Sequence, residues 1–293
     1  MDKYHELVGK SIVPADDEKV KAAVEKILAD NLEANRTKEV YRFLLSSIDL
    51  TTLNATDSPR SVAEFTEKVN SFDELHPDLP NVAAICVYPN FVPVVRTVLD
   101  VTQVRVAAVS GGFPSSQTFA EVKVAEAALA VDAGADEIDI VLNLGYFLDD
   151  DWESVCDEIS EQKDACRDAR MKVILETGAL KTAANIRAAS LLAMNSGADF
   201  IKTSTGKGYP GASLEAAYVM ASCIKEYFEA TGRMVGFKAS GGVVTADDAV
   251  RYYTVVKAVL GDAWLTPEYF RIGASRLANN ILSEVMEQEV THF

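Results

Sequence analysis

Short apolar segments alternate along most of the chain with longer stretches in which apolar residues recur every three to four positions. The first pattern is typical of buried strands and the second of amphipathic helices. The expected strands are residues 47–50, 82–88, 104–110, 137–143, 172–177, 199–204, 235–238 and 270–273. Helical periodicity is clearest over residues 121–131, 183–194, 214–228 and 246–259. Eight consecutive strand-helix units, with no linker rich in proline, serine or charge, predict an α/β protein built as a closed (β/α)8 TIM barrel rather than an open doubly wound sheet.

Residues that begin and end helices occur where this order needs them. Ser58 is a good N-cap followed by a first-turn proline, and Thr245 is a second helix start. Glycines that would adopt a left-handed conformation between a helix and the next strand are Gly134, Gly197 and Gly232. Before the first strand, helical patterning covers roughly residues 15–30 and 36–46. We therefore expect residues 1–44 to form an N-terminal helical extension packed on the barrel, and residues 45–293 to form the (β/α)8 catalytic domain.

Composition excludes several classes of partner. The 293 residues carry a formal net charge of -16, which argues against nucleic acid or an anionic membrane. An anionic substrate would need a local basic or amide-lined pocket, because the overall field repels it. The four cysteines are scattered without a CxxC pair, and no apolar run approaches the length of about 20 residues that spans a membrane. Free thiols and a cytoplasmic location are expected.

Polar residues interrupt the apolar strands at positions that can be assigned to one face, because side chains alternate across a strand. In the fourth strand, Asp139 would point into the barrel while its isoleucine neighbours face the helices. The same alternation turns Lys202 of the sixth strand and Lys238 of the seventh strand inward. The two lysines and the aspartate should therefore converge on one cavity.

Two inward ammonium groups repel each other unless one of them is neutral. A neutral lysine amine is a nucleophile toward carbonyl carbon, so the pair indicates Schiff-base chemistry. A structural ion pair remains the alternative for any one of these side chains. Asp49 could position a substrate hydroxyl or pair with one of the lysines. Cys86 and Tyr88 share a face of the second strand and could line the pocket, with a filler role as the alternative for the thiol. Glu176 could be an inward hydrogen-bonding group of the site, with a structural role as the alternative.

Glycines follow the last two strands, where barrel enzymes commonly bind phosphate through exposed amides and a helix N-terminus. Gly241 and Gly242 follow the seventh strand, while Gly273 and Ser275 precede the last helix. Glycine allows close approach of the backbone, and the serine adds a hydroxyl donor. These loops predict a phosphate pocket, in which Arg276 could add charge or instead face solvent.

Other ligand classes are less well supported. Residues 206–211 formally match GxGxxG, but the match contains a proline and falls in the sixth strand-helix unit, which makes a dinucleotide site a weak hypothesis. A P-loop is excluded because the required first glycine and the Ser or Thr after the lysine are absent from residues 201–208. The chain has three histidines, two of them near its termini, so we expect no histidine-based zinc site. Carboxylate-bound magnesium stays open, although the inward lysines would oppose it.

Several motifs together resemble the deoxyribose-phosphate aldolase family. They are residues 200–207, 236–242, 270–275, 49–53, 84–89 and 135–141. The resemblance runs from about residue 45 to residue 285. It implies a class I aldolase on a (β/α)8 barrel that reversibly cleaves 2-deoxy-D-ribose 5-phosphate to D-glyceraldehyde 3-phosphate and acetaldehyde. It further implies a role in deoxyribonucleoside catabolism, no metal or organic cofactor, and a homodimer.

By this resemblance, Lys202 is the Schiff-base lysine, Lys238 lowers its pKa, and Asp139 is the acid/base of the proton relay. The residues expected to contact the substrate are Asp49, Cys86, Thr205, Lys207, Gly241, Gly242, Gly273 and Ser275. The chain departs from the family in two places. It has Ala239-Ser240 where Pro-Ala is common, and its C-terminal residue is Phe293 rather than the tyrosine that assists proton transfer in some relatives.

Two rival functions remain. Another lysine-dependent aldolase of sugar phosphates, such as a transaldolase-like enzyme, would use the same amine on a different donor. A barrel retained as a phosphate-ligand sensor would use the lysines only as binding cations.

Overall fold

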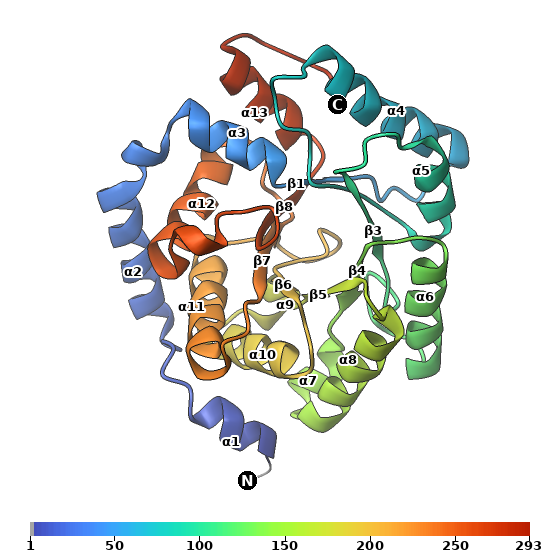
Figure 1. Ribbon diagram of the computed structural model, residues 1–293. Coiled ribbons are helices and arrows are strands. Elements are labelled where there is room, and N and C mark those ends of the chain that lie inside the picture. The colour runs from blue at the N-terminus through green and yellow to red at the C-terminus, as the bar shows by residue number, and fades with distance from the viewer. Residues whose placement is uncertain (1–2) are drawn as a thin grey trace.

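The computed structural model describes residues 3–293, and its eight parallel strands close into a barrel in chain order (Figure 1). The strands are β1 (Ile48–Thr51), β2 (Ala84–Val87), β3 (Arg105–Val109), β4 (Glu137–Val141), β5 (Arg170–Ile174), β6 (Phe200–Lys202), β7 (Gly236–Ser240) and β8 (Phe270–Ala274). Strand β8 pairs with β1, which closes the sheet. The predicted (β/α)8 barrel is confirmed, and all eight strands lie at the predicted segments.

Helices surround the barrel, and short 3-10 turns join some of them to the strands. The helices that follow strands are α4 (Pro59–Leu75), α5 (Val92–Val98), α6 (Ala120–Asp132), α7 (Leu144–Leu148), α8 (Trp152–Cys166), α9 (Thr177–Leu180), α10 (Ala183–Asn195), α11 (Leu214–Thr231), α12 (Ala246–Leu260) and α13 (Leu277–Met286). The 3-10 turns are η1 (Glu33–Asn35), η2 (Pro89–Phe91) and η3 (Asp262–Trp264). Ser58 and Thr245 both cap helices through capping boxes, as predicted. The three predicted glycines all have positive φ, between 72° and 105°.

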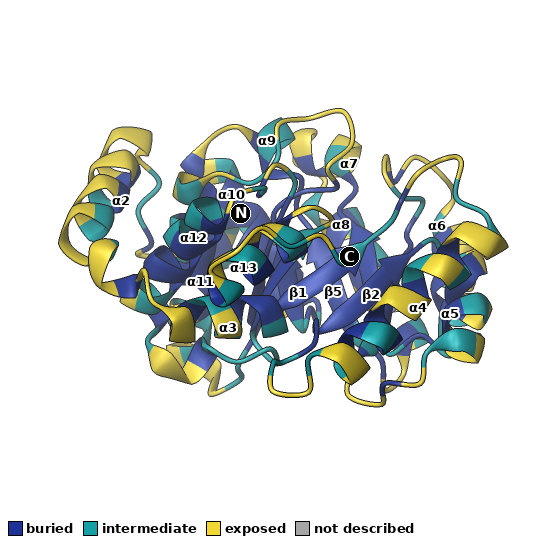
Figure 2. Ribbon diagram, turned by 90° about the horizontal axis from the view of Figure 1, so that it is seen from above, coloured by how far each residue is buried: buried dark blue, intermediate teal, exposed yellow. Residues whose placement is uncertain are grey.

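The two faces of each strand contact different surroundings. Outward side chains such as Ile138, Ile201 and Phe237 join the large apolar core between the strands and the helices. Figure 2 shows this burial at the centre of the molecule, with exposed residues on the outer helices and loops. The alternation predicted from the sequence is therefore correct for β4, β6 and β7.

The inside of the barrel is divided chemically. Beside β2 and β3 it holds a small apolar cluster made of Leu53, Ala84, Cys86, Ala107 and Val109. Elsewhere the interior contains charged side chains that are fully or almost fully buried. TIM barrels are usually filled by layers of branched apolar residues, so this buried charge indicates a specific chemical role.

Three helices precede the barrel: α1 (Lys3–Gly9), α2 (Asp17–Asn31) and α3 (Lys38–Ser46). Helix α2 packs against α11 and α12, on the outside of the molecule in Figure 1. The Asp17 carboxylate accepts a hydrogen bond of 2.7 Å from the Ala183 amide at the start of α10, and Asn35 donates one of 3.0 Å to Thr254 of α12. These contacts hold the N-terminal helices on the barrel wall. The division into two units at residue 44 stays a prediction, and residues 1 and 2 lie outside the described part.

Candidate active site

The three residues predicted to converge do meet. Strands β6 and β7 pair so that Lys202 and Lys238 lie side by side. Both ammonium groups reach the same oxygen: each Nζ lies 2.7 Å from Oδ2 of Asp139, which projects from β4. Lys202 retains 3% of its accessible surface, whereas Lys238 and Asp139 retain none. The three side chains form one cluster, in which Lys202 is the member that solvent reaches.

Deeper in the barrel, this cluster continues into a larger charged network. Asp49 of β1 pairs with Lys238 on one side and with Lys172 of β5, at 3.2 Å, on the other. Arg271 of β8 donates to Asp49 at 2.6 Å and to Glu137 of β4 at 2.8 Å. The sequence left two roles open for Asp49, and the structure shows the second, pairing with a lysine. Asp49 has no exposed surface and lies deeper in the barrel than Lys202.

The network balances its charge without Lys202. It contains three carboxylates, Asp49, Glu137 and Asp139, and three other cations, Lys172, Lys238 and Arg271. All six side chains are at most 1% exposed, so an uncompensated charge among them would be costly. A protonated Lys202 would be the fourth cation. The composition of the buried network therefore favours its neutral form.

The local electrostatics agree with this count. Burial lowers the pKa of Lys202, and the neighbouring Lys238 cation lowers it further, while Asp139 opposes the shift only in part. Burial also acts to lower the pKa of Lys238, but its two carboxylate partners outweigh that effect and raise the pKa above the ordinary range. The pKa values of the two adjacent lysines are thus shifted in opposite directions, so Lys238 holds its proton more tightly and Lys202 loses its proton more easily than a free lysine.

Asp139 remains ionised. Burial acts to raise the pKa of its carboxyl group, but Lys172, Lys202 and Lys238 together hold this pKa well below its usual value. Each of its oxygens has a different role: Oδ1 accepts from Lys172 at 3.0 Å, and Oδ2 faces the two other lysines. Asp139 is thus placed to receive a proton from the Lys202 amine and return it.

A cavity of about 500 Å³ lies at the carboxyl ends of the strands, lined mainly by residues at and after the ends of β1, β6, β7 and β8 and not by the charged cluster itself. Of the eight predicted substrate-contacting residues, Asp49 and Cys86 do not line this cavity. The other six do: Thr205, Lys207, Gly241, Gly242, Gly273 and Ser275. Gly241 and Gly242 have φ of 82° and 80°, a left-handed conformation that turns the loop around the cavity without steric cost. Arg276 also lines the cavity, and it is exposed to solvent there. Backbone amides, hydroxyls and two cationic side chains thus surround a space suited to an anion.

Gly273 links this cavity to the amine site. A Cβ atom at this position would lie 3.1 Å from Cε of Lys238 and 3.0 Å from Oγ of Ser240. Such contacts are tighter than ordinary side-chain packing, so a larger residue at this position would crowd Lys238 and Ser240. A ligand whose anionic group occupied the loops could extend its other end toward Lys202.

Comparison with known proteins identifies the family. A family model described as DeoC/LacD family aldolase matches residues 43–277. The chain belongs to the DeoC/LacD aldolase family. A relative from Caenorhabditis elegans is 42% identical over 271 residues, which are 91% of this chain and 88% of the relative. A Homo sapiens relative named deoxyribose-phosphate aldolase is 39% identical over 273 residues, covering 88% of this chain and 86% of the relative.

Solved structures agree with that assignment. The structure described as a tetrameric deoxyribose phosphate aldolase from Aeropyrum pernix is 25% identical. The match covers 88% of this chain and 96% of that chain, with a TM-score of 0.69. The protein is therefore an aldolase. Among residues 3–293, no helix is both long and apolar enough to cross a membrane.

Two further predicted residues have structural partners in this aldolase. Glu176, in a left-handed conformation after β5, accepts hydrogen bonds from the Thr205 hydroxyl at 2.5 Å and from the Thr205 amide at 3.3 Å. Burial raises the pKa of Glu176, and Thr205 partly opposes that rise. Glu176 therefore holds the loop that carries Thr205 and Lys207 at the cavity. Burial likewise raises the pKa of the Cys86 thiol, which lies in the apolar half of the interior as a neutral side chain.

The buried carboxylates of the site are poorly placed to bind a metal ion. Within residues 3–293, no group of three or more His, Cys, Asp and Glu side chains is arranged to hold a metal ion. The three buried carboxylates already contact lysine and arginine nitrogens. A metal ion could bind there only by displacing those cations.

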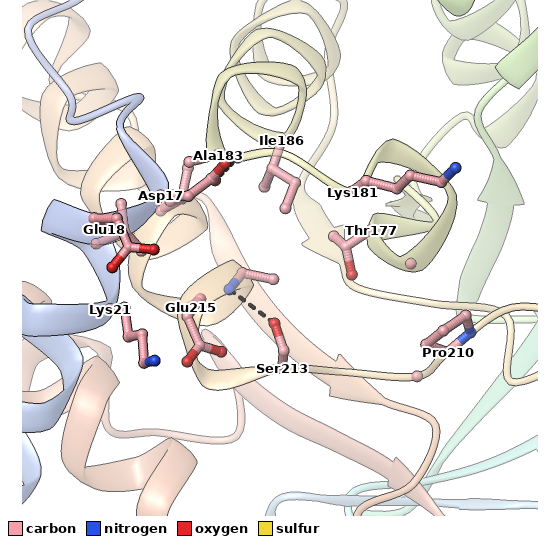
Figure 3. Close-up of a pocket in the computed structure, with 15 residues that line it drawn as sticks. Asp17, Glu18, Lys21, Thr177, Lys181, Ala183, Ile186, Pro210, Ser213 and Glu215 are labelled. Atoms are coloured by element: carbon pink, nitrogen blue, oxygen red, sulfur yellow. Dashed lines mark hydrogen bonds between the residues drawn. The ribbon is translucent and has the colours of Figure 1, made fainter.

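A second cavity lies outside the barrel, between α2 and the first turns of α10 and α11 (Figure 3). Its volume is about 470 Å³. Its polar lining includes Glu18, Lys21, Lys181 and Glu215, and none of the predicted site residues of this aldolase lines it. The active-site assignment therefore rests on the cavity at the barrel mouth.

Lys172 and Arg271 were missed as site residues. Both obey the same strand alternation that identified the other lysines, because Lys172 shares a face with Glu176 and Arg271 shares one with Gly273. Glu137 was assigned to the interior but not to an ion pair. Extending the alternation to β5 and β8 would have found both cations.

Proposed function

We propose that the protein is a class I aldolase that reversibly cleaves 2-deoxy-D-ribose 5-phosphate to D-glyceraldehyde 3-phosphate and acetaldehyde through a Schiff base on Lys202. One observation carries the proposal: a lysine whose pKa is lowered shares Asp139 with a fixed cation, Lys238, and Gly273, which lies against Lys238, lines a cavity that also contains Lys207 and Arg276. The activity named for the human relative supports the choice of substrate.

The phosphate would occupy the loops after β6, β7 and β8. Amides near Gly241, Gly242 and Gly273 face the cavity with the Ser275 hydroxyl, and Lys207 lies on the opposite loop. The Lys207 ammonium donates to the Leu53 carbonyl at 2.8 Å, which fixes its position beside the cavity. An anion held by these groups directs the aldehyde end of an open-chain sugar toward Lys202.

In the first step, the neutral Lys202 amine attacks the aldehyde carbon. The proton that the nitrogen must lose passes through Asp139 to the carbinolamine oxygen. A second proton, taken up from solvent, lets that oxygen leave as water and gives an iminium ion. The bond between carbons 2 and 3 then breaks while the 3-hydroxyl gives up its proton to Asp139, and the electron pair moves to the iminium to form an enamine. Glyceraldehyde 3-phosphate leaves. Protonation of the enamine and hydrolysis release acetaldehyde and restore the amine.

Lys238 would remain charged throughout this sequence. Its ammonium opposes protonation of Lys202 before attack and keeps Asp139 ionised as the proton acceptor. A free lysine titrates near a pKa of about 10.4, so an enzyme active at neutral pH needs this depression of the Lys202 pKa.

A coupled assay for glyceraldehyde 3-phosphate tests the proposal. Wild type should produce it from deoxyribose phosphate, and Lys202→Ala should not. Lys202→Arg is the control for the phosphate-sensor hypothesis, because it keeps the charge but forms no iminium. Function retained by Lys202→Arg would refute the aldolase mechanism, and faster cleavage of a fructose phosphate than of deoxyribose phosphate would favour the other sugar-phosphate aldolases.

We also propose a homodimer, a cytoplasmic location and a role in deoxyribonucleoside catabolism. Helix α6 and the residue before it expose Phe119, Val122 and Leu129, apolar side chains that a second copy could cover. Light scattering should give about twice the chain mass of 31.7 kDa. A mass equal to that of one chain would refute the dimer.

A further inference from the structure

Lys172 has the most carboxylate partners in the buried network. Its ammonium lies 3.2 Å from Asp49, 2.5 Å from Glu137 and 3.0 Å from Asp139. Among residues 3–293, no other side chain makes ion pairs with all three carboxylates. An ammonium group has three N–H donors, and each can point to a different carboxylate here. Lys172 and Lys202 contact different oxygens of Asp139, and Lys172 does not line the cavity at the barrel mouth.

We propose that Lys172 is a positioning residue that keeps Lys202 in its nucleophilic form, by fixing Asp139 and by supplying the third positive charge that the three buried carboxylates require. This inference rests on the proposed function, because it deepens the role of the same amine. In this proposal, the protonation of Lys202 depends on the whole buried charged network as well as on its neighbour Lys238.

The argument follows from the charge count. With Lys172 present, three cations neutralise three carboxylates, and a proton on Lys202, which is 3% exposed, would be an unbalanced charge in an almost fully buried site. Removal of the Lys172 ammonium leaves two cations for three carboxylates. The free Oδ1 of Asp139 and the excess negative charge would then stabilise a proton on Lys202, so the neutral amine would be lost at neutral pH.

The groups around Lys202 determine how cleanly this effect can be measured. Titratable or charged side chains face it from four neighbouring segments: Asp139 of β4, Lys238 of β7, the Cys86 thiol of β2, and Glu176 after β5. Below them lie Asp49, Glu137, Lys172 and Arg271. Arg105 lies 3.7 Å from Glu137, but it is one-third exposed and pairs with Glu268 at 2.9 Å. Glu137 is thus the carboxylate that can be neutralised without touching either Lys202 or Lys238.

Three variants test the charge count. Lys172→Met removes a cation, Glu137→Gln removes a carboxylate, and the double variant removes both and restores the balance. Glu137→Gln is close in shape to the native side chain, and it remains informative if Lys172→Met alone does not fold. Lys172→Arg keeps the positive charge as a rescue control.

The readout is the titration of Lys202 itself. Acetaldehyde condenses with the neutral amine, water leaves, and cyanoborohydride delivers hydride to give an N-ethyl group. Mass spectrometry of the Lys202 peptide then gives the labelling rate at each pH from about 5 to about 10. This rate follows the neutral fraction of the amine whatever sugar the enzyme cleaves, so failure of the proposed substrate leaves the test valid.

We expect the labelling midpoint to rise by about 1 to 2 pH units in Lys172→Met, from the loss of one charge at a few ångströms in a partly polarisable interior. Glu137→Gln should lower it, and the double variant should return to within about half a unit of wild type. Lys172→Arg should stay near wild type. An unchanged midpoint in Glu137→Gln, or shifts of the same sign in both single variants, would overturn the proposal, because a merely structural role for Lys172 produces no opposite and cancelling shifts.

Discussion

Lys238→Met removes the cation that lies beside the reactive amine, and its effect can be worked out from the geometry. Both ammonium nitrogens lie 2.7 Å from the same oxygen of Asp139. They are therefore roughly 5 Å apart, and at an effective dielectric constant of about 20 two such charges repel by roughly 3 kcal/mol. That energy corresponds to about 2 pH units in the pKa of Lys202. The variant also leaves Oδ2 of Asp139 to Lys202 alone, which acts in the same direction.

The expected result is a change in the pH profile rather than a uniform loss. At pH 7, kcat/KM should fall about 100-fold, because the neutral fraction of the amine falls by that factor. Activity should recover as pH rises, with the midpoint displaced upward by about 2 units. The assay is the coupled measurement of glyceraldehyde 3-phosphate over the pH range in which the enzyme stays folded, as checked by circular dichroism.

A matched control keeps the charge. Lys238→Arg retains a cation on β7 and should keep the pH midpoint near that of wild type, even if the larger side chain lowers kcat. The reasoning fails if Lys238→Met loses activity equally at every pH. That outcome would mean that Lys238 transfers a proton itself and does not act through Lys202.

Three further predictions concern the rest of the barrel. Gly236→Ala should lower the free energy of unfolding by about 2 to 3 kcal/mol, because its Cβ would overlap the Phe200 ring. Gly9→Ala is the control, because a Cβ at Gly9 would meet open space. In the same urea titration it should change the free energy of unfolding by less than about 0.5 kcal/mol. Lys207→Ala should raise KM for deoxyribose phosphate about 10-fold but leave cleavage of unphosphorylated deoxyribose unaffected, and equal losses on both sugars would exclude a phosphate contact. The three buried carboxylates have lowered pKa values in the folded protein, so their stabilisation is complete above the ordinary carboxyl pKa of about 4 and is lost as pH falls further. Urea midpoints should therefore decrease steeply below about pH 4, and constant midpoints there would contradict the buried ionic network.

The sequence predicted the barrel and the convergence of three charged residues inside it, because both depend on local periodicity. Alternation along a strand assigns a face to each residue without knowledge of distant partners, and this placed Asp139, Lys202 and Lys238 correctly inside. The loop positions followed from the rule that barrel sites lie at the carboxyl ends of strands. The cavity there contains Gly241 and Ser275, as that rule requires.

The pairing within the network was beyond local reasoning. Asp49 and Arg271 are 222 residues apart in the chain, and they meet because β8 closes on β1 with a particular register. Which inward cation reaches which carboxylate depends on that register and on the tilt of the strands. Sequence alone therefore left Asp49 with two possible roles, and the closed barrel decided between them.

The hydrogen bonds between Thr205 and Glu176 could not be predicted from the sequence either, because they too depend on tertiary structure. They depend on a positive φ of 56° at a glutamate, a conformation that non-glycine residues seldom adopt. The tertiary contact at the end of β5 imposes it. Sequence identified Glu176 as an inward polar group but could not identify its partner.

Reduction of the enzyme with borohydride in the presence of deoxyribose phosphate tests the central claim most directly. Neutral Lys202 should form an iminium that is reduced to a stable secondary amine, so peptide mass spectrometry should find the adduct on Lys202 with matching loss of activity. Inactivation should follow the modification of this one residue. A fully active enzyme with an unmodified Lys202, or an adduct confined to Lys172 or Lys238, would contradict the account.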